Sequence, residues 1–245
     1  MVGNLALAPF AQRQKLILKL GGLRKITSSI YEFSFPKPAG FIFKAGQYLE
    51  WMVPHKKADS RGTRRYFTIV SAPEEAELRL AFKLPEKASS YKTAMINLKA
   101  GDVVIGSQRS GDFILPTDKN EKLGFIAGGI GVTPFVSHVT SIAAKNERRD
   151  ITTLYCVATA ADMAYNEKLA SAGVLIPVVG NGEVPAGGES GFLSADIITR
   201  RVPDYAARTW YISGPPKMVD AAYRSLRALG VPARRIHRDF FPGLA

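Results

Sequence analysis

The spacing of hydrophobic residues changes near residue 117, and this change limits the possible folds more than any other feature of the chain. Before it, apolar and polar residues alternate in short runs, at residues 14–20, 30–35, 46–51 and 78–84. An alternation with a period of two is typical of β-strands. Glycine and proline residues separate several of these runs. One strand after another, with turns between them, predicts an antiparallel β-barrel.

Beyond residue 117, strand-like runs alternate with helical ones. An apolar run at residues 122–127 fits a parallel strand that is buried on both faces. Apolar residues then recur on one helical face between residues 135 and 143. Such alternation indicates an α/β layer with a parallel sheet. By the same patterns we expect strands at 151–157, 173–179, 209–213 and 236–240, helices at 161–170 and 218–229, and a glycine-rich mobile loop at 180–191.

These patterns predict a two-domain chain. Residues 1–13 form an N-terminal linker, residues 14–116 an antiparallel β-barrel domain, and residues 117–245 an α/β domain with a parallel sheet. The chain has 245 residues, and domains of roughly 100–200 residues are usual. Either half is long enough to bury its own core.

Cysteine content and charge narrow the classes of function. Cys156 is the single cysteine, which rules out a disulfide within the chain and a zinc or iron–sulfur site built from its cysteines. We expect no metal site and a reducing, cytoplasmic location. The formal net charge of +12 suits an acidic protein partner, an anionic membrane surface, nucleic acid or a nucleotide cofactor. A generally basic surface with no single partner is the alternative.

No apolar run reaches the roughly 18 residues that a membrane-spanning helix needs. Residues 1–11 lack a basic region followed by an apolar core, so we do not expect a secretory signal there. We interpret this segment as a linker, which would suit a soluble part cut from a larger protein.

The most informative motif lies at residues 64–71, which read Arg-Arg-Tyr-Phe-Thr-Ile-Val-Ser. Arginine can bind a phosphate through two parallel charged hydrogen bonds. An aromatic face can lie against a flat conjugated ring, and a threonine hydroxyl can meet its heteroatoms. Phosphate, flat ring and polar ring edge together describe a flavin nucleotide. An ordinary buried strand with two arginines at its exposed end is the alternative.

Two further segments have the pattern of phosphate-binding sites. Residues 89–96 place serines before helix formers, as at a capped helix start, and free N–H groups at a helix start attract anions. Residues 128–134 read Gly-Gly-Ile-Gly-Val-Thr-Pro between a predicted strand and a predicted helix. Strand, glycine turn and helix form a nucleotide-binding unit. A plain connecting helix and a tight turn without a ligand are the alternatives.

The order of these motifs over residues 14–243 resembles the ferredoxin–NADP reductase superfamily. The barrel strand of that family reads Arg-x-Tyr-Ser or Arg-x-Tyr-Thr, and Arg65, Phe67 and Thr68 stand at the matching positions. The resemblance implies that Arg65 holds the flavin pyrophosphate, Phe67 lies on the flavin ring and Thr68 meets the ring edge. Phe67 replaces the usual tyrosine and keeps its ring face. A usual glycine before the serine segment is missing. The flavin-site residues implied are Arg65, Tyr66, Phe67, Thr68, Lys83, Ser89, Ser90 and Tyr91.

The second half resembles the nicotinamide-nucleotide motifs of the same family. Residues 128–134 match the first motif, and residues 213–218, which read Ser-Gly-Pro-Pro-Lys-Met, match the second. Ser213 stands where many members have cysteine. The nucleotide-site residues implied are Gly128, Gly129, Gly131, Thr133, Pro134, Ser213, Gly214, Pro215 and Met218. The ending resembles those that approach the other face of the flavin, which implicates Phe240 and Phe241.

The resemblance implies a flavin-dependent oxidoreductase that passes hydride from NADH or NADPH to a bound flavin. Thr68, Thr133 and Ser213 would lie at the reacting atoms. FAD is favoured over FMN because Arg65 and Ser90 suggest a pyrophosphate site. Residues 158–162 contain no arginine for a 2′-phosphate, which favours NADH. We expect the three histidines to be surface or structural residues and Cys156 to serve packing.

Electrons would leave singly for ferredoxin, flavodoxin or a fused membrane electron-transfer domain, since the chain cannot hold a cysteine-ligated iron–sulfur cluster of its own. Contact with the cytoplasmic face of an anionic membrane fits the positive charge. A flavin-binding regulatory subunit with poor turnover and a basic nucleic-acid-binding protein are the alternative functions. We expect no nucleic acid partner, because the basic residues are scattered and no recognised nucleic-acid motif is present.

Overall fold

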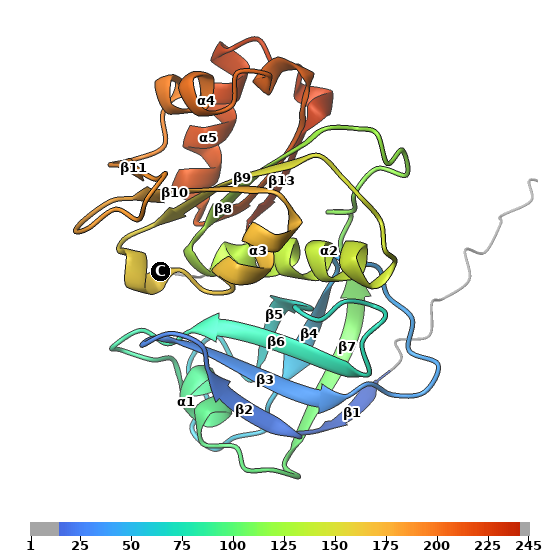
Figure 1. The fold of residues 1–245 in the computed structure, drawn as a ribbon. Helices are drawn as coiled ribbons and strands as arrows, with labels where there is room; N and C mark the ends of the chain where they lie inside the picture. Colours follow the sequence, from blue (N-terminus) through green and yellow to red (C-terminus); the bar gives the residue numbers. More distant parts are fainter. Residues whose placement is uncertain (1–14, 241–245) are drawn as a thin grey trace, which may run out of the picture.

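The structure is a computed structural model that describes residues 15–240 (Figure 1). The predicted linker at residues 1–13 and the predicted flavin contact Phe241 lie outside the described residues.

The first half consists of antiparallel strands in two sheets (Figure 1). One sheet has the order β1-β7-β4-β5, and the other has the order β2-β3-β6. The elements of this half are β1 (Leu16–Lys19), β2 (Gly22–Lys25), β3 (Ile30–Pro36), β4 (Tyr48–Met52), β5 (Arg64–Thr68), β6 (Glu77–Lys83), α1 (Ser90–Ile96) and β7 (Val103–Ser110).

The two sheets enclose a core of their own. Alternation along β4 places Leu49 and Trp51 in this core. Phe33 of β3 and Phe82 of β6 stack there with ring centroids 5.2 Å apart. The period-two pattern of the sequence therefore predicted the buried sides of β1 and β6.

The second half is an α/β layer built on a parallel sheet with the order β11-β10-β9-β8-β12-β13. Its elements are β8 (Leu123–Gly128), η1 (Gly129–Val132), α2 (Thr133–Ala144), β9 (Ile151–Val157), η2 (Ala160–Asp162), α3 (Asn166–Ala172), β10 (Val174–Val179), β11 (Glu189–Ser190), α4 (Ala195–Arg201), η3 (Tyr205–Ala207), β12 (Thr209–Gly214), α5 (Pro216–Ala228), η4 (Ala233–Arg235) and β13 (Ile236–Phe240).

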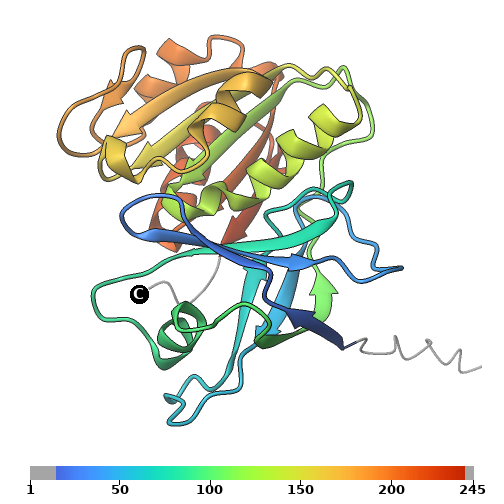
Figure 2. The ribbon, with the colours of Figure 1, turned by 60° about the horizontal axis from the view of Figure 1, so that its bottom comes forward.

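Helices cover both faces of this sheet (Figures 1 and 2). Helices α2 and α3 lie between the sheet and the antiparallel strands, while α4 and α5 lie on the opposite face. Successive residues of β8 point to opposite faces, so Phe125 packs with α2 and Ile126 packs with α4 and α5. The continuous apolar run of β8 is thus explained by burial on both sides.

The side of the sheet on which the chain adds strands reverses at β8, the first strand of this sheet in the sequence. From β8 the chain adds β9, β10 and β11 on one side, and then returns to add β12 and β13 on the other. The carboxyl ends of β8 and β12 therefore lie side by side at the reversal, with Ala127 opposite Ser213. In open α/β sheets, ligands bind in the crevice outside such a reversal.

The predicted fold class is confirmed, since antiparallel sheets precede a parallel α/β layer. The predicted boundary at residues 116 and 117 falls between β7 and β8 and stays a prediction. The helix expected at 161–170 is wrong in detail: η2 and α3 are separate, and Tyr165 between them has a left-handed backbone with φ 58°. The short elements β2, β11 and α4 carried too few periodic residues for us to predict them.

Candidate active-site cleft

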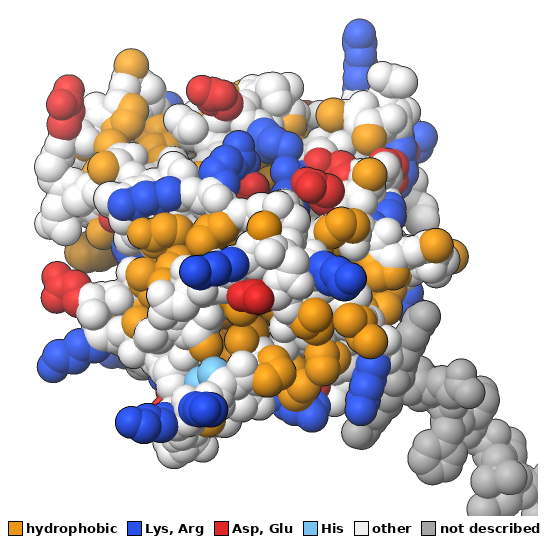
Figure 3. Space-filling view, turned by 90° about the horizontal axis from the view of Figure 1, so that it is seen from below, with side chains coloured by type: hydrophobic (Ala, Val, Ile, Leu, Met, Phe, Trp, Pro, Cys, Tyr) orange, Lys and Arg blue, Asp and Glu red, His pale blue; other side chains and the backbone are white. Residues whose placement is uncertain are grey.

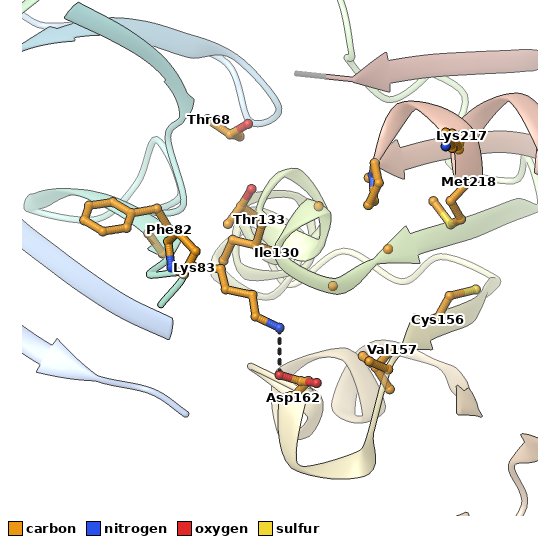
Figure 4. Close-up of a pocket in the computed structure, with 18 of the residues that line it drawn as sticks. Thr68, Phe82, Lys83, Ile130, Thr133, Cys156, Val157, Asp162, Lys217 and Met218 are labelled. Carbon is orange, nitrogen blue, oxygen red and sulfur yellow. Dashed lines mark hydrogen bonds and ion pairs between the residues drawn. The ribbon is translucent and has the colours of Figure 1, made fainter. Parts of the chain in front are cut away.

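A cleft of about 1040 Å³ opens between the antiparallel half and the carboxyl edge of the parallel sheet. Figure 4 shows Thr68 and Phe82 on one side of it and Lys217 and Met218 of α5 on another. Most of the residues predicted to bind cofactors line this one cleft. They are Arg65, Tyr66, Phe67, Thr68, Lys83, Ser89, Gly128, Gly129, Gly131, Thr133, Gly214, Pro215 and Met218.

Strand β5 brings an aromatic ring and a hydroxyl to the cleft. The ring of Phe67 lies 5.7 Å from that of Phe82, in a stacked arrangement, and 5.9 Å from that of Tyr91. Thr68 is buried, and its Oγ1 has no hydrogen-bond partner among the described residues. An unpaired buried hydroxyl costs free energy, so this oxygen is suited to a polar atom that enters the cleft.

Arg65 is held by its own loop. Its Nη1 donates to the backbone oxygens of Arg61, Gly62 and Arg64, at 2.8, 3.1 and 2.6 Å. Its Nη2 lies 3.3 Å from Asp59 Oδ1, and its guanidinium lies over the Tyr91 ring. Arg65 thus lines the cleft, but both of its terminal nitrogens already interact with oxygens of the same chain.

Tyr66 and Arg64 extend from the other face of β5. Tyr66 is 46% exposed and packs edge-on against Tyr48, and its hydroxyl donates to Gln108 Oε1 at 3.3 Å. Arg64 forms an ion pair of 2.8 Å with the buried carboxylate of Glu50. Both residues still border the cleft.

The second predicted phosphate-binding segment, at the start of α1, lines the cleft only in part. Ser89 caps α1 by accepting a hydrogen bond from Lys92 N at 3.3 Å, as the sequence indicated. Ser90 Oγ is instead hydrogen-bonded to Asp59 N at 2.9 Å and to His55 Nε2 at 3.1 Å. Tyr91 is fully buried beneath Phe67. Of the three, Ser89 lines the cleft, and Ser90 and Tyr91 do not.

Lys83 is paired across the cleft. Its Nζ lies 3.0 Å from Asp162 Oδ1, which belongs to η2 in the parallel half (Figure 4). Asp162 has a pKa below its usual value; burial opposes this shift, and hydrogen bonds and the charge of Lys83 cause it. The pair connects residues 79 positions apart in the chain.

The two glycine-containing turns of the parallel half touch each other at the sheet reversal. A Cβ on Gly131 would lie 2.5 Å from the Cα of Gly214. A Cβ on Gly128 would lie 2.7 Å from Met218 Cε. Only glycine allows this approach, so both turns can present bare backbone to the cleft.

Thr133 begins α2 and lines the cleft, whereas Pro134 and Ser213 do not. Ser213 is fully buried, and its Oγ has no hydrogen-bond partner among the described residues. Phe240 is the last residue of β13, and its side chain is not described. These positions stay predictions.

Comparisons with known proteins give a consistent result. Residues 125–224 match the model of the oxidoreductase NAD-binding domain family. The aromatic O-demethylase reductase subunit of Amycolatopsis sp. is 29% identical over 210 residues, which cover 81% of this chain and 61% of that protein. The NADH oxidoreductase HCR of Escherichia coli is 28% identical over 206 residues, which cover 84% and 62%. The chain therefore spans about three fifths of the length of these relatives.

Solved structures agree in fold. The Amycolatopsis cytochrome P450 reductase GcoB superimposes with a TM-score of 0.80 at 26% identity, over 93% of this chain and 70% of that one. A ferredoxin NADP+ reductase from Neisseria gonorrhoeae superimposes with a TM-score of 0.78 at 18% identity, over 92% and 98%. The chain is thus similar in fold to structures of the ferredoxin–NADP reductase type, and its parallel half matches the oxidoreductase NAD-binding domain family.

The histidines lie outside the cleft wall. His138 is buried in α2 among Phe113, Phe125 and Tyr211, and burial lowers its pKa to about 3. His237 stacks on Tyr211 with ring centroids 4.5 Å apart. These contacts are those of packed residues, as the sequence suggested.

Several of the residues that line the cleft were not predicted. Cys156 lines the cleft beside Val157, and burial raises the pKa of its thiol to about 12, which leaves it protonated. Phe192 is 86% exposed and lines the cleft. Lys92 of α1 also lines the cleft. A lysine inside a predicted cofactor segment was a signal that we did not use.

The distribution of charged side chains on the surface and the hydropathy of the helices are relevant to contacts with proteins, membranes and metal ions. Figure 3 shows Lys and Arg side chains spaced among hydrophobic and uncharged ones on the face seen from below. None of the helices within residues 15–240 has the length and hydropathy that crossing a membrane requires. In the same range no group of three or more His, Cys, Asp or Glu residues could hold a metal ion.

Proposed function

We propose that this protein is an NAD(P)H-dependent flavoprotein reductase of the ferredoxin–NADP reductase superfamily, with FAD bound against residues 14–116 and the nicotinamide nucleotide against residues 117–245. The observation that carries this proposal is that the β5 motif and the two glycine turns open into a single cleft. Relatives named as reductase subunits or components support it.

The flavin half of the cleft fits a flavin. Phe67 offers a ring to the cleft wall, and the orphaned Oγ1 of Thr68 offers a hydroxyl to a ring heteroatom. Tyr66 adds a second exposed aromatic ring. Arg65 supplies positive charge for a phosphate, although Asp59 and three backbone carbonyls now share it.

The parallel half fits a nucleotide. Gly128, Gly131 and Gly214 place backbone without side chains at the sheet reversal, where a pyrophosphate can approach closely. Pro215 and Met218 line the wall beside them. Ser213 has an orphaned buried hydroxyl directly before Gly214.

When bound, the cofactors supply the chemistry, which is hydride transfer from the reduced nicotinamide to the flavin and release of single electrons from the flavin. The chain's own residues bind and orient. Phe67 and Met218 present apolar surface that excludes water from the cleft, and Thr68 offers a hydroxyl proton to a ring heteroatom. Thr133 and Ser213 would position the nicotinamide. The histidines are given no role in proton transfer, since none lines the cleft.

NADH is the donor that the cleft favours. Ala158, directly after β9, and Asp162, at the end of η2, line the cleft. The carboxylate of Asp162 is paired with Lys83 and cannot bind the 2′-phosphate of NADPH, and residues 158–162 contain no arginine that could. A ribose hydroxyl is compatible with a nearby carboxylate.

The electron acceptor is a separate protein or domain. The chain cannot form a cysteine-ligated cluster, and it spans about three fifths of its curated relatives, among them a propane 2-monooxygenase reductase component and flavohemoproteins. We propose an acidic electron-transfer protein, or a fused electron-transfer domain in a longer protein, because the net charge of +12 favours a negatively charged partner. A single cysteine fits a cytoplasmic setting.

An anaerobic stopped-flow experiment tests the proposed function. Flavin-loaded protein is mixed with NADH or NADPH, and the visible absorbance of the flavin is followed. We expect bleaching by both nucleotides and a faster reaction with NADH. Protein that retains flavin but is bleached by neither nucleotide would contradict the reductase assignment and support a regulatory flavin-binding subunit.

A further inference from the structure

The flavin half of the cleft contains more positive charge than carboxylates of the same chain neutralise. The cleft-lining cations of this half are Arg61, Arg64, Arg65, Lys83, Lys87 and Lys92. Arg64 is paired with Glu50, Arg65 with Asp59 and Lys83 with Asp162. Arg61 is 4.0 Å from Asp59. Within residues 15–240, no carboxylate lies within ion-pair distance of Lys87 or Lys92.

These last two lysines differ in their exposure to water. The side chain of Lys87 is exposed, so water solvates its charge. Lys92 is half-buried and lies 5.6 Å above the ring of Phe82. Its Nζ donates to the backbone oxygen of Lys83 at 2.7 Å, which uses one of the three donors of an ammonium group. Lys92 thus keeps donor capacity at a site where its charge is poorly solvated.

The surroundings of Lys92 make its charge costly unless an anion is present. Burial, and after it the positive charges of Arg61 and Arg65, lower the pKa of Lys92 to about 8. The charged groups that act on it are Arg61, from the loop before β5, and Arg65, from β5. Lys83 of β6 accepts its hydrogen bond through the backbone, and the carboxylates nearby are already paired. An anionic ligand would relieve both the repulsion and the desolvation.

We propose that Lys92 is the cation that binds the phosphate of the flavin nucleotide and distinguishes it from unphosphorylated riboflavin. This inference rests on the proposed function, because it assumes that a flavin occupies this half of the cleft. Arg65 was predicted to hold the flavin pyrophosphate and Lys83 to belong to the flavin site, but carboxylates of the same chain already engage both. Lys92 stands next to them, and a phosphate at this position would also attract Arg65 and Arg61.

This role makes flavin binding dependent on pH. Phosphate binding favours the charged form of Lys92, so the affinity for FAD falls as pH rises through the pKa of the free protein. Asp59 and Asp162 have lowered pKa values and remain ionised across this range. Riboflavin lacks a phosphate, so its affinity should not share this dependence.

Equilibrium binding to the flavin-free protein tests the inference. FAD, FMN and riboflavin are titrated at pH 7 and pH 9.5 into wild-type protein, Lys92→Gln, Lys92→Arg and Lys99→Gln, with flavin fluorescence as the readout. Lys99 is an exposed lysine shortly after α1 and serves as the matched control. Thermal unfolding of each variant reports whether it is folded.

At pH 7 we expect Lys92→Gln to bind FAD and FMN at least tenfold more weakly than wild type and riboflavin equally well. Lys92→Arg should restore most of the FAD affinity, and Lys99→Gln should bind like wild type. Wild-type affinity for FAD should fall severalfold by pH 9.5, and that of Lys92→Gln should not. Equal FAD affinity in folded Lys92→Gln and wild type, or an equal loss for riboflavin, would overturn the inference while leaving the reductase assignment standing. Wild-type protein that binds none of the three flavins would overturn the proposed function itself.

Discussion

Two buried threonine hydroxyls in this protein have no hydrogen-bond partner among the described residues, and they lie in different places. Thr68 ends β5 at the cleft, and Thr153 lies within β9 away from the cleft wall. A buried unpaired hydroxyl costs roughly 1–3 kcal/mol. The cost at Thr68 is explained if the hydroxyl serves a ligand, and we have no such explanation for Thr153.

At the scale of the residue, we predict that Thr68→Val and Thr153→Val behave alike in stability and differently in function. Each should stabilise the flavin-free protein by about 1 kcal/mol, because an apolar group replaces the unpaired hydroxyl. Thr68→Val alone should slow flavin bleaching by NADH, by about tenfold or more, since a polar contact to the reacting ring is lost. Urea unfolding and stopped-flow absorbance are the measurements. An unchanged bleaching rate in Thr68→Val would exclude a direct role for its hydroxyl.

At the scale of the element, the close contact between the turn after β8 and the turn after β12 is what shapes the nucleotide half of the cleft. Parallel pairing of β8 with β12 brings their carboxyl ends together. Gly131 and Gly214 then meet backbone to backbone. A side chain at either position must separate the two turns.

We predict that Gly131→Ala lowers the free energy of unfolding by about 1–3 kcal/mol, because the added methyl group overlaps the Gly214 backbone. The displaced turns should also slow NADH-dependent bleaching while the flavin content stays normal. Gly21→Ala is the control, since a Cβ there meets Ser34 O at an ordinary 3.4 Å. Flavin absorbance after purification and stopped-flow rates distinguish the two variants; a Gly131→Ala protein with wild-type rates would place the nucleotide elsewhere.

At the scale of the whole molecule, one hydrophobic cluster contains residues of both halves. Ile30, Val70 and Ala81 of the antiparallel half pack in the same cluster as Phe125 and Val136 of the parallel half. Across this interface the buried Ser137 Oγ donates to Ser71 O at 2.7 Å. Such continuity favours cooperative unfolding of both halves.

His138 lies in this shared region and should make the protein sensitive to acid. Its pKa is about 3 in the folded protein because of burial, against about 6.5 in an unfolded chain. Between these values the unfolded state binds one more proton, so stability falls as pH falls, by up to about 1.4 kcal/mol per pH unit. Asp239 acts in the opposite sense, because burial raises its pKa to about 6. It is present in wild type and in a His138 variant alike, so it does not affect the difference between their slopes.

We therefore predict that His138→Phe loses stability less steeply than wild type between pH 6.5 and pH 4. Chemical denaturation at several pH values measures the difference in slope. Parallel curves for wild type and His138→Phe would show that His138 is protonated in the folded state or that the unfolded value is also low.

Short-range patterns in the sequence were sufficient for the architecture and for the motifs that bring most of the predicted cofactor-binding residues to the cleft. Period-two runs predicted the buried faces of β1 and β6, and the glycine turn at residues 128–134 predicted the junction of β8 and α2. These features depend on neighbouring residues and on backbone sterics, which are local. The motif at residues 64–71 likewise predicted that Phe67 and Thr68 face a common cleft.

Which charged residues form ion pairs inside the cleft could be determined only from the tertiary structure. Lys83 and Asp162 are 79 positions apart, and Asp59 reaches Arg65 through a loop with no periodic pattern. No local rule predicts such contacts, because they depend on how two sheets and their loops are placed in three dimensions. The sequence identified Arg65 and Lys83 as cations of the flavin half; only the folded surroundings determined that both are paired with carboxylates and that Lys92, which was not predicted, has no carboxylate partner within residues 15–240.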